Sequence, residues 1–362
     1  MNSFIEKIAG GGGRKIPSLD GLRALSIALV LIGHLAGTRN FPLGSVALGA
    51  FDLNFGNLGV RVFFVISGFL ITSLLMDELS KTGTISLKQF YLRRTFRIFP
   101  PFYVFLAAIL LLALTGILSV PWKDFVTAAT YTMNFIGDRG WSLGHLWSLA
   151  VEEQFYLLWP FVLASLGLRS AMRAAAFVVV VSPLVRIGLA YAMPSQLNTI
   201  GNSFYTIADP LAVGCLLAGS GRRLTANLRY QEFLRSPWIH ALGASIIVVN
   251  ALPWTKLNFL IFQSYVNIAI AVCLDSVVRY PNTRSGYILN LGPVRAIGVL
   301  SYSLYLWQQL FVDRNGTFWW NTFPANLVLA IAAAIVSFFF VERPTLALRK
   351  RVESHIRNSE NG

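Results

Sequence analysis

Long runs of apolar residues alternate with short polar segments that are rich in arginine and lysine along this 362-residue chain. A helix needs about 20 predominantly apolar residues to cross the hydrocarbon core of a bilayer, and ten segments approach that length. These segments are residues 21–38, 58–76, 98–118, 146–167, 172–191, 204–220, 237–253, 257–274, 296–312 and 325–341. The pattern predicts an all-α polytopic membrane protein with about ten transmembrane helices. The weakest segment is 204–220, because it contains Asp209 and Pro210.

The composition supports a membrane protein and argues against other classes. Hydrophobic residues make up 55% of the chain and charged residues only 13%, whereas soluble domains carry about 25% charged residues. The net charge of +14 could suit a nucleic-acid binder, but the basic residues fall in short clusters between apolar runs, so we expect no nucleic-acid partner. Cys215 and Cys273 both lie within apolar runs without metal-ligand spacing, and we expect no metal site.

The distribution of the basic residues predicts the orientation of the chain. With both termini in the cytoplasm, the cytoplasmic segments hold 22 lysines and arginines and the external segments hold 7, as the positive-inside rule requires. The seven external residues are Arg39, Arg61, Lys123, Arg139, Arg186, Lys256 and Arg314. We therefore expect cytoplasmic tails at 1–15 and 352–362 around a transmembrane domain at 16–351.

Two ionisable residues lie inside the first apolar segment, where charge is costly and often functional. Arg23 and His34 are eleven residues apart, which places them on one helical face about 16 Å apart along the axis. In the predicted orientation Arg23 lies near the cytoplasmic end and His34 in the outer half. Arg23 could instead snorkel to the interface, and His34 could cap a neighbouring polar group.

A second group of ionisable residues, His145, Glu152 and Glu153, opens the segment 146–167. Adjacent side chains on a helix point about 100° apart, so at most one glutamate can face His34. A buried carboxylate beside an imidazole could orient it and raise its basicity, as a general base needs. The other glutamate could pair with an arginine or with His145. The alternative is a purely structural ion pair between helices.

A third group, Arg93, Arg94 and Arg97, lies before Pro100 and Pro101, where we expect a cytoplasmic loop to meet the third span. Three guanidinium groups in this spacing suit a phosphate-bearing ligand, although arginines also anchor helices at the cytoplasmic face. The three groups together fit an enzyme that joins a cytoplasmic phosphorylated donor to an external hydroxyl. They fit a proton-coupled transporter nearly as well.

Six motifs in chain order resemble those of the acyltransferase 3 family of bacterial membrane O-acyltransferases, over residues from about Ile16 to about Arg351. The motifs are Ser18-Leu-Asp20-Gly-Leu-Arg23 leading to Gly33-His34, the segment from Gly59 to Thr72 with Ser67 and Gly68, Arg93-Arg94-x-x-Arg97-Ile-x-Pro100, the segment from His145 to Tyr156 with Trp147, Ser148, Glu152, Glu153 and Gln154, Ser301-Tyr302-x-x-Tyr305-x-Trp307, and Val341-Glu342-Arg343-Pro344.

The resemblance implies a bacterial inner-membrane enzyme without a permanently bound cofactor. It would transfer an acyl group, usually acetyl, from cytoplasmic acyl-CoA to a hydroxyl of an extracytoplasmic or lipid-linked glycan. His34 would deprotonate the acceptor hydroxyl or assist acyl passage, and Glu152 or Glu153 would orient it. Arg23 and the loop arginines 93, 94 and 97 would hold the pantetheine end and the phosphates of the donor. Asp20, Ser67 and His145 lie within the matching motifs and would support the site.

The chain departs from the family pattern in two respects. Many members carry a histidine after Tyr-Leu-Trp in the ninth helix, whereas this chain has Gln308, which could still form a hydrogen bond. Some members also carry a C-terminal SGNH-type esterase domain. We expect this chain to be the form without that domain, acting alone or with separate polysaccharide-assembly proteins.

Two other functions remain open at this point. A transporter or flippase of a glycan or lipid-linked substrate could use His34 and Glu152 as a proton relay, although no internal repeat or pseudo-symmetric halves are evident. A purely structural scaffold would leave the buried charges without a purpose. Acceptor specificity is expected in the external segments 39–57 and 119–145, which contain aromatic residues such as Trp122 and Trp141 that can stack on sugars.

Overall fold

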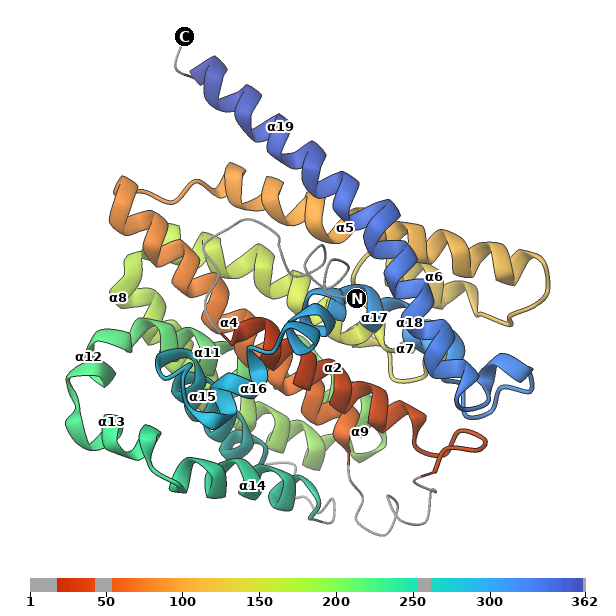
Figure 1. Cartoon of the computed structure of the whole chain (residues 1–362), viewed down its shortest axis with the longest axis horizontal. Helices are drawn as coiled ribbons and strands as arrows, with labels where there is room; N and C mark the ends of the chain where they lie inside the picture. Colours follow the sequence, from red (N-terminus) through yellow and green to blue (C-terminus); the bar gives the residue numbers. More distant parts are fainter. Residues whose placement is uncertain (1–17, 43–53, 253–261, 361–362) are drawn as a thin grey trace.

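The computed structural model describes residues 18–42, 54–252 and 262–360, which are helical almost throughout and include no strand (Figure 1). The predicted all-α class is confirmed. Four helical segments are long and apolar enough to cross a membrane: Phe55–Thr82, Leu87–Leu114, Trp141–Ala192 and Ala325–Ser354. Two shorter apolar helices, Asp209–Gly219 and Trp238–Asn250, add to them. The count of ten spans and their orientation stay predictions.

The helices follow the predicted apolar segments closely. The main ones are α2 (Leu19–Leu35), α4 (Phe55–Thr82), α5 (Leu87–Leu114), α8 (Leu146–Ala192), α11 (Asp209–Gly219), α14 (Trp238–Asn250), α15 (Gln263–Arg279), α17 (Gly292–Phe311), α18 (Ala325–Ser337) and α19 (Arg343–Glu360). Short helices connect them: α6 (Trp122–Ala129), η1 (Met133–Phe135), α7 (Trp141–Gly144), η2 (Pro194–Gln196), α9 (Leu197–Ile200), α10 (Phe204–Ile207), α12 (Gly221–Ala226), α13 (Leu228–Arg235), α16 (Arg284–Leu289), η4 (Trp319–Asn321) and the π-helical turn η5 (Phe338–Glu342).

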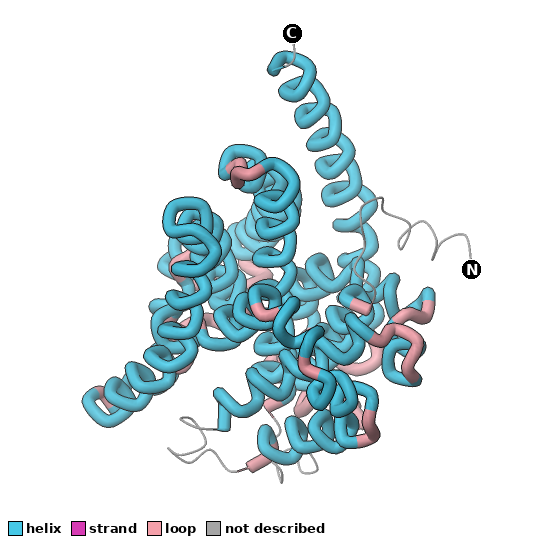
Figure 2. Tube along the Cα trace, turned by 90° about the vertical axis from the view of Figure 1, so that its left-hand side faces the viewer, coloured by secondary structure: helices cyan, strands magenta, loops and turns pink. Residues whose placement is uncertain are grey.

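The structure differs from the predicted segments at two boundaries. The segments 146–167 and 172–191 form one element, α8, which changes direction at Gly167, where the backbone adopts a φ of +72° that glycine tolerates best. The C-terminal tail predicted at 352–362 is helical as far as Glu360, because α19 continues from α18 and projects away from the body (Figures 1 and 2).

Helix α2 packs against both α4 and α17 at glycine positions that let the backbones approach closely. A Cβ atom on Gly59 of α4 would lie 2.5 Å from the carbonyl oxygen of Ser26, and one on Gly298 of α17 would lie 1.7 Å from that of Asp20. Small residues at helix contacts are typical of membrane proteins. This packing fixes the positions of α4 and α17 relative to the side chains of α2.

The prediction that the arginine group lies where a loop meets a helix is wrong. Helix α5 already begins at Leu87, and Pro100 and Pro101 lie inside it rather than ending it. A membrane helix tolerates prolines when neighbouring helices pack around them and supply other hydrogen bonds to the backbone. Ile98 and Phe102 beside the prolines are buried, and the Tyr302 hydroxyl of α17 donates to the Ile98 carbonyl at 2.8 Å, which joins α5 to α17.

A buried polar network explains how an aspartate fits the weakest predicted span. Asp209 begins α11 and contacts Arg186 of α8 at 3.4 Å, and it accepts a hydrogen bond from Asn267 of α15 at 2.8 Å. Asn267 in turn accepts one from Arg61 of α4 at 3.1 Å. Arg61 and Arg186 are 6% and 0% exposed. Both arginines are thus buried between helices, and the side of the membrane that they face stays a prediction.

Candidate active site

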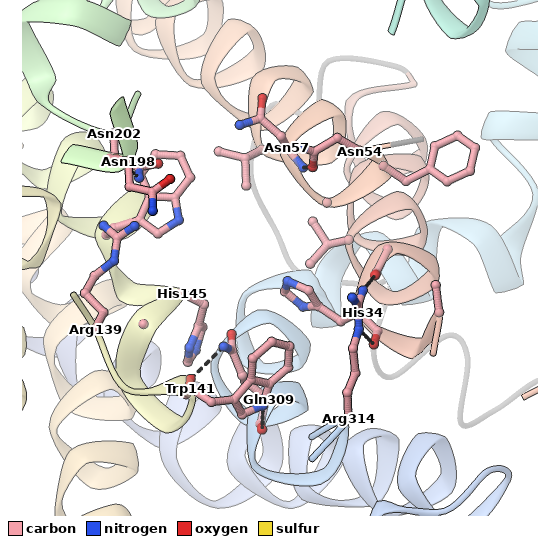
Figure 3. Close-up of a pocket in the computed structure, with 18 of the residues that line it drawn as sticks. His34, Asn54, Asn57, Arg139, Trp141, His145, Asn198, Asn202, Gln309 and Arg314 are labelled. Carbon is pink, nitrogen blue, oxygen red and sulfur yellow. Dashed lines mark hydrogen bonds between the residues drawn. The ribbon is translucent and has the colours of Figure 1, made fainter. Parts of the chain in front are cut away.

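A cavity of about 660 Å³ lies where the C-terminal ends of α2 and α17 meet the N-terminal ends of α4 and α7 (Figure 3). Its wall includes two of the predicted residues, His34 and His145. Trp141, which was expected to contact the acceptor, also lines it. The cavity is large enough for a ligand of several hundred Å³, which is the usual size range of small-molecule sites.

His34 lies in the last turn of α2, and Gln308 of α17 holds its ring. Nδ1 of His34 lies 2.9 Å from Oε1 of Gln308. An amide oxygen can only accept, so in this arrangement Nδ1 carries the proton and Nε2 has the lone pair. Gly56 lies beside that atom, and a Cβ there would be 3.6 Å from Nε2. The glycine thus leaves the basic nitrogen open to the cavity.

Arg314 and Trp141 complete the surroundings of His34. Arg314 donates to the carbonyl oxygens of Gly33 at 2.6 Å and of His34 at 3.5 Å, which have no partner within the helix at its C-terminal end. A cation at this end is also favoured by the helix dipole. The Trp141 ring packs edge-on against the imidazole with the centroids 5.6 Å apart. Both contacts restrict the movement of His34.

His145 precedes α8 and lines the same cavity as His34. Its Nε2 lies 3.2 Å from the Leu306 carbonyl oxygen of α17, so this nitrogen is the donor. The Tyr305 hydroxyl donates to the His145 carbonyl at 2.9 Å. His145 is only 4% exposed, so it forms part of the wall and joins α8 to α17.

The expected contact between His34 and Glu152 or Glu153 is wrong. Both glutamates line a second, narrower cavity of about 90 Å³. Glu152 accepts hydrogen bonds from Ser67 of α4 and from the Tyr156 hydroxyl, the latter at 3.2 Å. The physical reason is distance along α8. His145 stands at the level of His34, and a residue seven positions further lies about 10 Å along the helix axis.

The second cavity gathers most of the predicted arginines. Arg23, Arg94 and Arg97 line it together with the two glutamates. Arg23 is 3.5 Å from Asp20 on the preceding turn, and the Arg94 guanidinium stacks over the Tyr156 ring with Cζ 4.4 Å from the centroid. This part of the structure is therefore a basic pocket whose charge is partly balanced by carboxylates.

Arg93 does not belong to this cavity. It pairs with Glu78 of α4 at 3.2 Å, and its side chain is 38% exposed. On a helix, adjacent residues point about 100° apart, so the neighbours Arg93 and Arg94 face different surroundings. The structure thus separates the three arginines that the sequence groups together.

The two cavities adjoin, because Val60 of α4 and Tyr305 of α17 line both. One holds a histidine with an open basic nitrogen, and the other holds guanidinium groups that can bind an anion. No cluster of three or more metal-ligating side chains occurs among the described residues. The arrangement can bind an anionic molecule on one side and activate a hydroxyl on the other.

Sequence reasoning missed Arg139 and Arg314 as components of the larger cavity. Both belong to the seven basic residues that fall on the predicted external side. Two others of the seven, Arg61 and Arg186, are buried between helices. Exceptions to the positive-inside distribution were therefore the available signal for arginines with a specific role.

The fold and the two cavities define an all-helical membrane protein with a histidine-lined cavity beside a basic pocket. The chain belongs to the acyltransferase 3 family, because the family described as an acyltransferase domain matches residues 16–342. The resemblance drawn from the six motifs is confirmed.

Two of the curated relatives come from Staphylococcus aureus. O-acetyltransferase OatA of strain NCTC 8325 is 29% identical over 377 residues, covering 91% of this chain and 57% of the relative. A protein of strain COL, whose name marks its O-acetyltransferase assignment as provisional, is 30% identical over 361 residues with the same coverage. The chain thus spans little more than half the length of these relatives. No solved structure matches the chain.

Proposed function

We propose that this chain is an inner-membrane O-acyltransferase that transfers an acetyl group from cytoplasmic acetyl-CoA to a hydroxyl of an extracytoplasmic or lipid-linked glycan. The observation that carries the proposal is the contact between the two cavities, which brings a basic pocket next to an open histidine nitrogen. The names of the relatives as O-acetyltransferases support acetyl as the group transferred.

The donor would enter through the narrower cavity. With the N-terminus in the cytoplasm, the end of α2 that carries Arg23 faces inward, and Arg94 and Arg97 lie beside it. Their guanidinium groups would bind the phosphates of coenzyme A. A cavity of about 90 Å³ suits the thin pantetheine arm better than the nucleotide. The thioester would then reach the junction at Val60 and Tyr305.

The acceptor would occupy the larger cavity, with its hydroxyl at His34. Nε2 removes the proton as the oxygen attacks the thioester carbonyl, so that a C–O bond forms and the C–S bond breaks. The proton then passes from the imidazolium to the departing thiolate. The products are an O-acetyl ester and free coenzyme A. Gln308 keeps the proton on Nδ1 and so keeps Nε2 available.

The test is acyl transfer from radiolabelled acetyl-CoA in membranes that contain the full chain. We expect His34→Ala to lose at least 100-fold in rate, which is the usual contribution of a general base. His240→Ala is the matched control, because His240 is exposed on α14 and remote from both cavities.

Two results would contradict the proposal. One is transfer by His34→Ala at the wild-type rate, which would remove the proposed base. The other is uptake of a glycan into proteoliposomes without any dependence on acetyl-CoA, which would identify a proton-coupled transporter or flippase instead.

A further inference from the structure

The larger cavity carries positive charge without a matching carboxylate on its wall. Arg139 and Arg314 line it, and none of its described lining residues is an aspartate or a glutamate. Its other polar groups include the neutral amides Asn57, Asn198 and Asn202. A cleft lined by one sign of charge attracts ligands of the opposite sign.

The two arginines have different tasks. Arg314 is already occupied, since it donates to the last carbonyls of α2 at 2.6 and 3.5 Å. Arg139 makes one hydrogen bond among the described residues, a long one of 3.4 Å from Nη1 to the Met133 carbonyl, and no ion pair within 4.0 Å there. A guanidinium has five N–H donors. Most of the donors of Arg139 are therefore available to a ligand.

The acidic residues near Arg139 do not satisfy it. Asp124 attracts it electrostatically, but that carboxylate is fully buried behind the wall and accepts the Gly140 backbone N–H at 2.7 Å. Asp138 pairs with Lys123 at 3.0 Å. The guanidinium of Arg139 thus faces the cavity as an incompletely satisfied cation.

Arg139 stands beside Asn198 and Asn202, on the wall opposite His34 (Figure 3). A group bound at Arg139 would therefore lie away from the reacting hydroxyl. Arginine forms bidentate pairs with carboxylate and phosphate groups, and asparagine amides suit sugar hydroxyls. Trp147 and Trp141, which packs against His34, also line the cavity and can stack on sugar rings.

We propose that the acceptor is an acidic glycan whose carboxylate or phosphate binds Arg139, while its hydroxyl lies at His34. This inference rests on the proposed function and names the substrate class of that site. Binding of the remote acidic group positions the hydroxyl, so an equivalent neutral glycan reacts more slowly.

The first experiment reads occupancy of Arg139 and does not depend on catalysis. The full chain in proteoliposomes is treated with phenylglyoxal, and labelling of Arg139 is followed by mass spectrometry with galacturonate, galactose or inorganic phosphate present. We expect galacturonate, phosphate or both to slow labelling of Arg139 severalfold, and galactose to have no effect. Protection of Arg139 by galacturonate alone would identify the acidic group of the acceptor as a carboxylate, and protection by phosphate alone would identify it as a phosphate. Arg39, which donates to the Gly316 and Phe318 carbonyls and does not line the cavity, is the internal reference.

Equal labelling of Arg139 under all conditions would overturn the inference. Protection by acetyl-CoA alone would also overturn it, because Arg139 would then serve the donor.

The second experiment compares acyl transfer to uronate oligosaccharides and to their carboxyl-reduced counterparts. A charge-assisted pair with arginine corresponds to a preference of about 10- to 100-fold in kcat/KM for the acidic acceptor. Arg139→Gln should reduce this preference to near unity, and Arg39→Gln should retain it. Arg139→Gln with an unchanged preference contradicts the inference. Absence of any His34-dependent turnover of acetyl-CoA contradicts the proposed function instead, and leaves the labelling result to decide the role of Arg139.

Discussion

At the residue scale, the partner of His34 is a neutral amide rather than a carboxylate. Oε1 of Gln308 lies 2.9 Å from Nδ1 and fixes the tautomer and the ring orientation. A carboxylate in that place would also stabilise the imidazolium, which a neutral amide does less well. Gln308 is therefore suited to keep His34 neutral and basic before the acceptor binds.

We expect Gln308→Ala to lower acyl transfer by about 10- to 100-fold, by analogy with the loss of a partner that orients a metal-bound histidine. The KM for acetyl-CoA should stay unchanged, because Gln308 does not line the narrower cavity where we propose that the donor binds. Steady-state kinetics with labelled acetyl-CoA measure both quantities. Gln231→Ala is the control, since Gln231 bonds to Tyr280 and lies outside both cavities. A normal rate in Gln308→Ala would show that His34 needs no such partner.

Arg93 and Arg94 form a matched pair for testing the donor site. Arg94→Gln should raise the KM for acetyl-CoA by about 10-fold or more, because a charge-assisted hydrogen bond contributes about 1.5–3 kcal/mol. Arg93→Gln should change it less than about 3-fold, because an exposed pair such as Arg93–Glu78 contributes little. Steady-state kinetics with labelled acetyl-CoA measure the KM of both variants. Equal effects of the two substitutions would argue against the narrower cavity as the donor site.

The sequence predicted which residues line the narrower cavity better than it predicted which side chains contact each other. Arg23, Arg94, Arg97, Glu152 and Glu153 were each named as candidates, and they line one cavity. The pairing of a glutamate with His34 failed because helix periodicity indicates which face a residue occupies but not the level at which two helices meet.

At the element scale, close glycine contacts hold α2 against α4 and α17. Gly298 lies against the Asp20 backbone, where a Cβ would come within 1.7 Å of the carbonyl oxygen. Because α2 carries His34 and α17 carries Gln308, the distance between these helices determines whether the two side chains meet. The contact at Gly298 therefore links packing to the geometry of the site.

We expect Gly298→Ala to lower the free energy of unfolding by about 1–3 kcal/mol, the usual cost of overpacking, and to reduce acyl transfer as α17 moves away from α2. Thermal unfolding in detergent and the transfer assay measure the two effects. Gly243→Ala in α14 is the control, because a Cβ there meets nothing within 4 Å and alanine favours the helix by up to about 1 kcal/mol. A Gly298→Ala protein with normal stability would mean that the helices adjust without cost.

At the scale of the whole molecule, the predicted orientation places the α4–α5 loop in the cytoplasm and the segment after α17 outside. Single cysteines test this in a chain whose Cys215 and Cys273 are replaced by alanine. A membrane-impermeant maleimide should label Asn315→Cys in intact cells, and should label Thr82→Cys only after permeabilisation. Both positions are exposed. The reverse pattern would invert the assignment of donor and acceptor sides.

The amino-acid sequence by itself determined the all-helical class and the family. It also identified candidate site residues in the apolar segments 21–38, 58–76 and 146–167 and just before the segment 98–118. These follow from local composition, spacing and motif order, because a run of apolar residues has few stable forms in a bilayer. Only the tertiary structure decided which of these residues meet. It separated His34 from the glutamates, joined it to Gln308, divided Arg93 from Arg94 and brought Arg139 and Arg314 into the larger cavity. Such contacts depend on the level at which helices pack against each other, and close approaches such as that of Gly298 to Asp20 set this level.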